Sequence, residues 1–337
     1  MKELLKRLVP ESLIAWARGM QSSMRLRRET NRQMKRFARN YAKRGSKRIA
    51  HLETRIIFFT HQIEKGLSHG NFRHGFGKGV LAEFAPLLVA LRQQDRGYRN
   101  NDIYRSALSA LHDYRARHEA DGFDLTYMRK NFPDDLWREI GEADPRYGGV
   151  LSIKAEDKED SASKTFVELS QARHSVREFS NEPVSATEIE QAVSIAMRTP
   201  SVCNRQPTRV HIITNADLIA KLMPIQHGFN GYPLPPALVL VTSDIQAFMN
   251  PDERNEGFVD GGLFSMSLLL ALEEQRLAAC PLNTCLPMQR DDATRKLLNL
   301  PDNELLVMYI AVGHFLPETK TCMSRRFDDN DIVTVHA

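Results

Sequence analysis

Cysteine is scarce in this chain of 337 residues, which has only four. They all lie in the C-terminal half, and no two have the Cys-x-x-Cys spacing of zinc ribbons or redox dithiols. The metal-binding pattern His-Glu-x-x-His is also absent. In a chain of this size, few and scattered thiols favour the reduced form, so we expect neither a disulfide framework nor a metal site. The positions are Cys203, Cys280, Cys285 and Cys322.

Long apolar runs are missing too. No stretch approaches the roughly 20 apolar residues that a membrane-spanning helix needs, and the longest runs, at 268–272 and 305–312, have the length of core elements. The leucines at the start of the chain are interrupted by Lys6 and Arg7, unlike a secretory signal. With 42% hydrophobic and 26% charged residues, the composition is typical of a soluble globular protein. We therefore expect a cytoplasmic protein.

Acidic residues are few in the first 55 positions, which hold four glutamates against sixteen lysines and arginines. A basic arm over residues 1–55 suits an anionic membrane surface or an acidic partner protein, and would make the chain peripheral to the membrane. A solvated, partly disordered arm explains the same composition equally well. Aromatic residues are not interleaved with these cations as in single-strand binders, so a nucleic acid is the weaker expectation.

Residues 1–140 are predicted to form a mainly helical region. Apolar residues recur at helical spacing in 51–65, 80–92 and 103–119. Gly66 would end the first of these helices in a left-handed conformation. His61 and Glu64 share a face of that helix and could act in a substrate pocket, but a helix-end pair is the interpretation that we favour. Residues 141–163 are rich in glycine and charge, which predicts a linker.

Residues 164–337 are predicted to form a second domain of alternating helices and strands. Ser185–Glu188 is a capping box at the start of a helix that Pro200 ends. Apolar runs at 210–214, 237–242 and 305–312 predict strands, and Asp260 can cap a helix that runs to Leu277. This mixture predicts the α+β class with a central sheet.

Three segments of this second domain carry residues suited to chemistry. The first, 173–179, puts two arginines, an imidazole and a hydroxyl within five positions, a set suited to phosphate. The second, 199–207, offers hydroxyl and amide groups in a loop with two prolines, and the third, 280–284, is a proline-fixed loop after an apolar helix. Each segment taken alone is more simply explained as surface charge or an ordinary turn.

Taken in order, these segments resemble the nitroreductase family. Its members share Arg-(Arg/His)-Ser-x-(Arg/Lys)-x-Phe, followed by Pro-Ser-x-x-Asn-x-Gln-Pro and later by a strand that ends in glycine, with an arginine beyond it. The resemblance covers about half the chain, from Thr165 to Val335. The matching residues are Arg173, His174, Ser175, Arg177 and Phe179, then Pro200, Ser201, Asn204, Gln206 and Pro207, then Tyr309–Gly313.

The resemblance implies a nitroreductase-like FMN-binding fold, with a central mixed or antiparallel sheet flanked by helices. The flavin phosphate would be held by Arg173 and Ser175, with His174 beside them and Arg325 or Arg326 completing the site. Arg177 would lie near the pyrimidine end of the flavin. Pro200, Ser201, Val202, Asn204 and Gln206 would belong to the flavin site of the other subunit of a homodimer, and Pro281, Leu282 and Asn283 would line the ring.

The activity that the resemblance implies is that of an FMN-dependent oxidoreductase. NAD(P)H would reduce FMN, and a nitroaromatic, a quinone or a more specialised acceptor would take the electrons in a ping-pong mechanism. Specialised members, such as reductive dehalogenases and flavin-cleaving enzymes, share the motif and stay open. The alternative is a flavin-binding adaptor of low turnover, attached to a membrane or a partner protein by its basic arm. The sequence departs from the family pattern at Thr208, at Arg276 and in the divergent loop 223–233. Asn230 of this loop is a weak candidate for a flavin contact. These departures leave the substrate undetermined.

Overall fold

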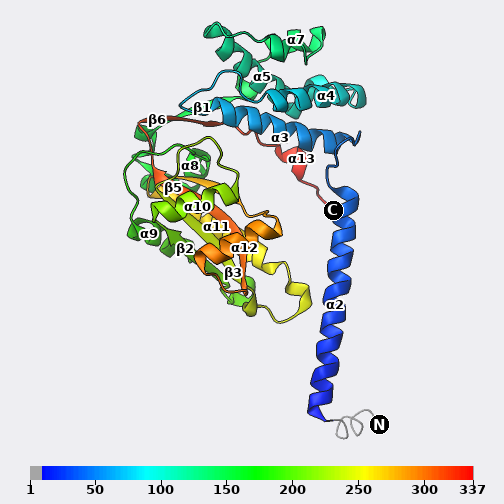
Figure 1. Cartoon of the computed structure of the whole chain (residues 1–337), viewed down its shortest axis with the longest axis vertical. Helices are drawn as coiled ribbons and strands as arrows, with labels where there is room; N and C mark the ends of the chain where they lie inside the picture. Colours follow the sequence, from blue (N-terminus) through cyan, green and yellow to red (C-terminus); the bar gives the residue numbers. More distant parts are fainter. Residues whose placement is uncertain (1–9, 337) are drawn as a thin grey trace.

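The computed structural model describes residues 10–336 and shows a long helix, a helical region and an α+β part (Figure 1). The helices of the first half are α2 (Glu11–Asn40), α3 (Ile49–Leu67), α4 (Lys78–Gln94), α5 (Asp102–Ala120), α6 (Thr126–Arg129) and α7 (Asp134–Gly141). Within the described residues, no helix is both long enough and apolar enough to cross a membrane.

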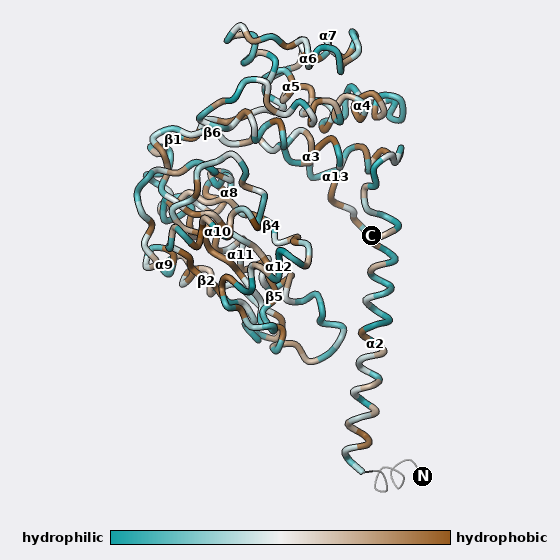
Figure 2. The backbone as a smooth tube through the Cα atoms, viewed as in Figure 1, coloured by the Kyte–Doolittle hydropathy of each residue, from teal (hydrophilic) through white to brown (hydrophobic). Residues whose placement is uncertain are grey.

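Helix α2 projects away from the other helices (Figure 1), and none of its residues is buried. It contacts the body through its middle, where Arg25 pairs with Asp252 and the Arg254 Nε donates to Gln33 Oε1 at 3.1 Å. Figure 2 shows hydrophilic residues dominating this helix, with hydrophobic ones between them. The basic arm predicted over 1–55 is therefore largely helical, and its first nine residues lie outside the described part of the chain.

Helices α3 to α7 share one apolar core, and the periodicity of their sequences explains it. The predicted helices 80–92 and 103–119 are confirmed as α4 and α5. The predicted stop at Gly66 is wrong, because α3 continues through it to Leu67. Glycine is needed there for space: a Cβ at Gly66 would lie 1.8 Å from the Cε2 atom of Phe76. The core includes Leu52, Ile56, Ile63, Phe84, Leu88, Leu111 and Tyr114.

The α+β part is built on a four-stranded antiparallel sheet in the order β2-β3-β5-β4. Successive side chains of a strand point to opposite faces. In β3 (Ala237–Asp244), Val239 and Val241 accordingly pack with helices α9 (Ala186–Ala196) and α11 (Glu256–Glu274) on one face of the sheet. Leu238 and Leu240 pack with helix α10 (Ala216–Gln226) on the other face. The strands are β2 (Thr208–Ile213), β3 (Ala237–Asp244), β4 (Leu277–Asn283) and β5 (Glu304–His314), and the helices are α8 (Phe166–Ala172), α9 (Ala186–Ala196), α10 (Ala216–Gln226), α11 (Glu256–Glu274), α12 (Met288–Leu298) and α13 (Asp329–Ile332).

The segment predicted as a linker contains regular structure. Strand β1 (Val150–Lys154) pairs antiparallel with β6 (Glu318–Cys322), which returns from the far end of the chain. Lys158, just after β1, is buried, and its Nζ lies 2.6 Å from the Oε1 of Glu273 on α11. The segment 141–163 thus packs on both parts of the chain, and the boundaries of the two domains stay a prediction.

Candidate functional site

The first motif, residues 173–179, is fixed by backbone contacts to the edge of the main sheet. The Val176 amide donates to the Ala279 carbonyl at 3.0 Å, and Ser175 forms a parallel bridge with Ala279. On the other side, the Thr321 hydroxyl donates to the Ser175 carbonyl at 2.8 Å. The motif therefore lies between β4 and β6, which fixes the directions of its side chains.

Arg177 is the innermost cation of this motif and is only 8% exposed. Its Nη1 donates to the Ser175 carbonyl at 3.3 Å and to the Cys322 sulfur at 3.5 Å. It lines a cavity of about 740 Å³ together with Pro281, Leu282 and Asn283 of β4. The structure thus brings four predicted site residues to one cavity, while their contact with a flavin stays a prediction.

The opposite wall of this cavity comes from the helical region, which sequence reasoning did not place in the site. Lys65 and His69 lie at and after the end of α3, and Arg73 follows in the next loop. Aromatic and aliphatic side chains from the same region complete the wall. The remaining lining residues are Phe58, Phe59, His61, Gln62, Gly66, Phe76, Gly77 and Val80, with Gln226, His227, Gly228 and the predicted weak candidate Asn230 from the loop after α10.

Positive charge dominates the cavity. Burial, and secondly the neighbouring Arg177, lower the pKa of Lys65, whose Nζ donates to the Gly228 carbonyl at 3.0 Å. Burial also lowers the pKa of His69 to about 4, helped by Arg73, Lys65 and Arg177. The His69 ring stacks on Tyr232 with the ring centres 3.8 Å apart. His69 is therefore neutral at pH 7 and surrounded by fixed cations.

The two arginines near the end of the chain have different surroundings. Arg325 donates through Nη2 to Asp102 Oδ2 at 2.9 Å and so faces the helical region. The positive charge of Arg326 instead lies near Arg173. Burial, and secondly this charge, lower the pKa of Arg173. The Nε of Arg173 is buried and has no hydrogen-bond partner within the described residues. His174 lies beside them, and its Nδ1 donates to the Ala172 carbonyl at 2.8 Å.

The second motif forms a separate, smaller site. Pro200, Ser201 and Gln206 line a cavity of about 40 Å³ next to α11, and none of them lines the larger cavity. The loop turns sharply, since Cys203, Asn204 and Gln206 all have positive φ. A further neighbour of this loop, Asp260, was predicted to cap a helix.

That prediction for Asp260 is wrong, because α11 begins at Glu256 and Asp260 lies inside it. Both of its carboxylate oxygens instead accept from the Val202 amide at 3.2 Å. A buried carboxylate within α11 thus holds the second motif in place.

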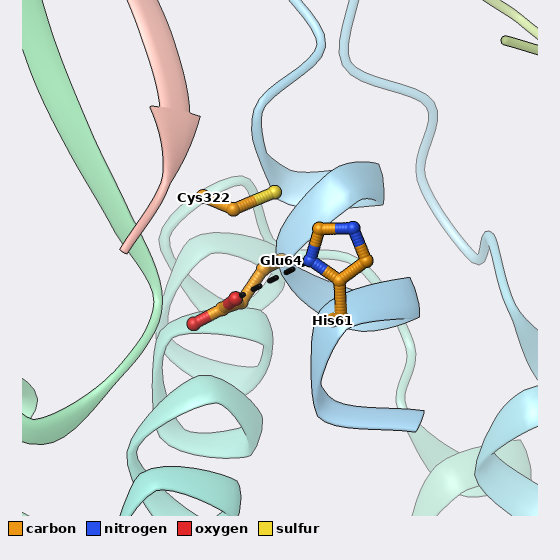
Figure 3. A group of neighbouring side chains, drawn as sticks. All are labelled: His61, Glu64 and Cys322. Atoms are coloured by element: carbon orange, nitrogen blue, oxygen red, sulfur yellow. Dashed lines mark ion pairs between the residues drawn. The ribbon is translucent and has the colours of Figure 1, made fainter. Parts of the chain in front are cut away.

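Figure 3 shows His61, Glu64 and Cys322 gathered where α3 meets the end of β6. Their polar atoms lie within 4.8 Å of one another, and the His61 Nδ1 is 3.9 Å from Glu64 Oε2. Glu64 is 1% exposed and accepts from the backbone amides of Gly149 and Ser324, at 3.2 and 3.3 Å. Burial raises the pKa of Cys322 to about 12. Glu64 therefore joins the helical region to β1 and β6, a role wider than that of a helix-end pair.

Comparison with known proteins places the α+β part. The model of the Nitroreductase family matches residues 171–246 and 233–314. A nitroreductase family protein from Clostridium difficile is 24% identical and covers 52% of this chain and 99% of its own, with a TM-score of 0.43. A nitroreductase with bound FMN from Desulfitobacterium hafniense is 20% identical and covers 51% and 97%, with a TM-score of 0.39. No curated protein is significantly similar to this chain.

The matched segment contains the first two motifs, the whole four-stranded sheet and the β4 wall of the larger cavity. Helices α2 to α7 precede it, although α3 supplies the other wall. Residues 171–314 of this chain form a domain of the nitroreductase family.

Proposed function

We propose that this protein is an FMN-dependent oxidoreductase, in which NAD(P)H reduces the flavin and a second substrate then takes the electrons. The observation that carries the proposal is the cavity shared by Arg177 and the 281–283 stretch of the family-matched domain. A flavin supplies the redox chemistry by accepting and passing on a hydride. The task of the protein is to bind it, orient it and set the local charge.

A second group of predicted residues, which does not line this cavity, suits a phosphate. The unpartnered, buried Nε of Arg173 is a donor without an acceptor, and Arg326 adds a second cation close enough to lower the pKa of Arg173. Two guanidinium groups held together are costly unless an anion lies between them. We assign Arg173, Ser175 and Arg326 to the phosphate, and leave Arg325 to its partner Asp102.

The larger cavity suits the flavin ring. Arg177 is buried and has no carboxylate partner within residues 10–336. A fixed cation beside the pyrimidine end would favour the reduced, anionic form of the ring. Pro281, Leu282 and Asn283 come from the last part of β4, so their backbone is rigid where the ring would lie.

The proposed homodimer rests on an apolar face of α11. Phe258, Val259, Leu263 and Met266 are each between 42 and 51% exposed, although the opposite face of the helix is buried in the core. The second motif lies against the same helix, next to its buried residues Asp260 and Phe264. Pairing through α11 would bring the 200–206 loop of one subunit to the flavin of the other. In light scattering, Leu263→Glu should convert a dimer to a monomer, whereas a wild-type monomer would contradict the proposal.

An absorption spectrum followed by anaerobic addition of NADPH and then NADH tests the proposed activity. A yellow protein that bleaches with either donor supports it. A yellow protein that does not bleach retains the flavin site but contradicts NAD(P)H as the donor. A colourless protein that cannot be reconstituted with FMN contradicts the site assignment. As a control, Arg173→Met with Arg326→Met should weaken FMN binding, while Arg325→Met should leave it unchanged.

A second candidate function concerns α2. Its exposed apolar residues include Trp16, Met20, Met24 and Phe37, and arginines and lysines occupy other faces of the helix. A helix with this distribution lies well at an anionic lipid surface. We propose that α2 attaches the protein to such a surface, as the flavin-binding adaptor would require. Sedimentation with anionic vesicles, lost on deleting residues 1–40 and absent with zwitterionic vesicles, would support it, whereas no binding at low salt would contradict it.

A further inference from the structure

The larger cavity holds more positive charge than a flavin ring needs. Its lining includes Lys65, Arg73 and Arg177 and no aspartate or glutamate. None of these three cations has an ion pair with a carboxylate among residues 10–336. Under the proposed function, Arg177 serves the flavin. Lys65 and Arg73 then remain, and both come from outside the family-matched segment.

Lys65 is fixed close to this charge, whereas Arg73 lies at an exposed position in the loop after α3. Lys65 is anchored by its hydrogen bond to the Gly228 carbonyl, and a Cβ at Gly231 would lie 3.4 Å from the Arg73 Nη2. Between them, His69 is buried against Tyr232. One carboxylate, that of Glu178, lies 3.9 Å from His69. It does not line the cavity, and both of its oxygens accept from the Gly70 amide.

The remaining wall is apolar and largely aromatic. Phe58 and Phe59 of α3 and Phe76 of the following loop face the same cavity. Phe58 is 57% exposed and its ring lies edge-on to that of Phe59, so the three rings offer an apolar surface against which an aromatic molecule can pack. Like charges gathered beside such a wall raise the free energy of the empty site, and a bound anion would lower it.

We propose that the electron acceptor is an aromatic compound that carries a negative group, bound by Lys65 and Arg73 against the phenylalanine wall. This inference rests on the proposed function, since it assigns the acceptor of that reaction. For a quinone, the overall reaction is balanced as NAD(P)H plus H⁺ plus quinone giving NAD(P)⁺ plus hydroquinone. The helical region thus selects the substrate, and the family domain supplies the flavin site.

Binding of naphthalene-2-sulfonate to the purified holoprotein, measured by calorimetry, tests the site without any turnover. Its neutral control is 2-naphthalenemethanol. We expect the sulfonate to bind at least tenfold more tightly than the neutral control. Lys65→Met and Arg73→Met should each weaken sulfonate binding about tenfold, which corresponds to about 1.4 kcal/mol. Lys65→Arg should retain binding. Lys47→Met removes the same charge from an exposed position outside the cavity and should change nothing.

Equal binding of the two naphthalenes, or sulfonate binding that neither variant weakens, would overturn the proposal. Arg73 is exposed, so its variant remains informative even if Lys65→Met fails to fold. A second arm compares the half-reactions with 1,4-naphthoquinone-2-sulfonate and its uncharged parent quinone. If the variants slow only reduction by NADPH, the cations bind the phosphates of the electron donor and the acceptor assignment is wrong. A protein that binds the sulfonate but does not bleach with NAD(P)H contradicts the proposed function alone.

Discussion

Replacing Lys158 with methionine should destabilise the protein by about 3 to 5 kcal/mol, the range for removing one partner of a buried ion pair. The side chains of Lys158 and Glu273 are only 5% and 3% exposed, with Nζ and Oε1 2.6 Å apart. The same Nζ donates to the Ala172 carbonyl at 2.5 Å. The methionine variant would leave the Glu273 carboxylate buried without its counter-charge, and a backbone carbonyl without its donor.

The effect should be measured by urea and thermal unfolding at two pH values. A loss of this size lowers the melting temperature on the order of 10 °C. Burial raises the pKa of Glu273, and removing Lys158 raises it further. A carboxyl with a raised folded-state pKa stabilises the fold when it is protonated, so the deficit of the variant should be larger at pH 8 than at pH 5.

Two controls separate charge burial from the loss of a side chain. Lys154 pairs with Glu156, but their side chains are 54% and 68% exposed, so Lys154→Met should leave the stability nearly unchanged. The double variant Lys158→Met with Glu273→Met should recover most of the lost stability, because it leaves no buried charge. If Lys158→Met itself unfolds within about 1 kcal/mol of the wild type, the reasoning is refuted and the pair is open to solvent.

Two further changes test the wall that α3 contributes. Gly66→Ala should destabilise by about 1 to 3 kcal/mol despite the better helix propensity of alanine, because its Cβ meets Phe76. Urea unfolding should show no such loss for Gly79→Ala, which has open space, and equal effects of the two would count against the packing. His69 has a pKa of about 4 against 6.5 when unfolded, so the unfolded chain binds more protons between these values and the stability rises as the pH is raised across that window. His69→Asn should flatten this slope, and an unchanged slope would show that folding does not lower the pKa of His69.

The sequence predicts best what depends on local pattern. Helices α4 and α5 follow from apolar periodicity, and β2, β3 and β5 follow from apolar runs between turns, whereas the loop predicted over 280–284 is wrong because residues 277–283 form strand β4. The gathering of Arg177 with Pro281 at one cavity was expected from a motif whose order reflects a shared fold. The helices and strands need only short stretches of sequence, whereas the site needs the three motifs taken in order.

What the sequence did not reveal depends on contacts between distant residues. Lys158 lies in a charged segment and is buried with a partner on α11, so it carries no hydrophobic signal. Strand β1 is short and pairs with a strand more than 160 positions later in the sequence. Gly66 is typical of a helix end in the sequence, whereas in the structure a glycine is needed there because the ring of Phe76 packs against it. Lys65 meets the Gly228 carbonyl across 163 positions, and no local pattern could have placed α3 over the cavity.

The buried carboxylate of Glu64 has a consequence for how the protein is made. One of its two amide donors, that of Ser324, comes 260 positions later in the sequence. A ribosome that adds about 5 to 20 residues per second needs roughly 10 to 50 s to synthesise the intervening chain. For that time the nascent helical region carries Glu64 without one of its donors and β1 without β6. The residues from Glu318 to Ser324 therefore complete the contacts of β1 and of Glu64 only after the helical region and the four-stranded sheet have been synthesised.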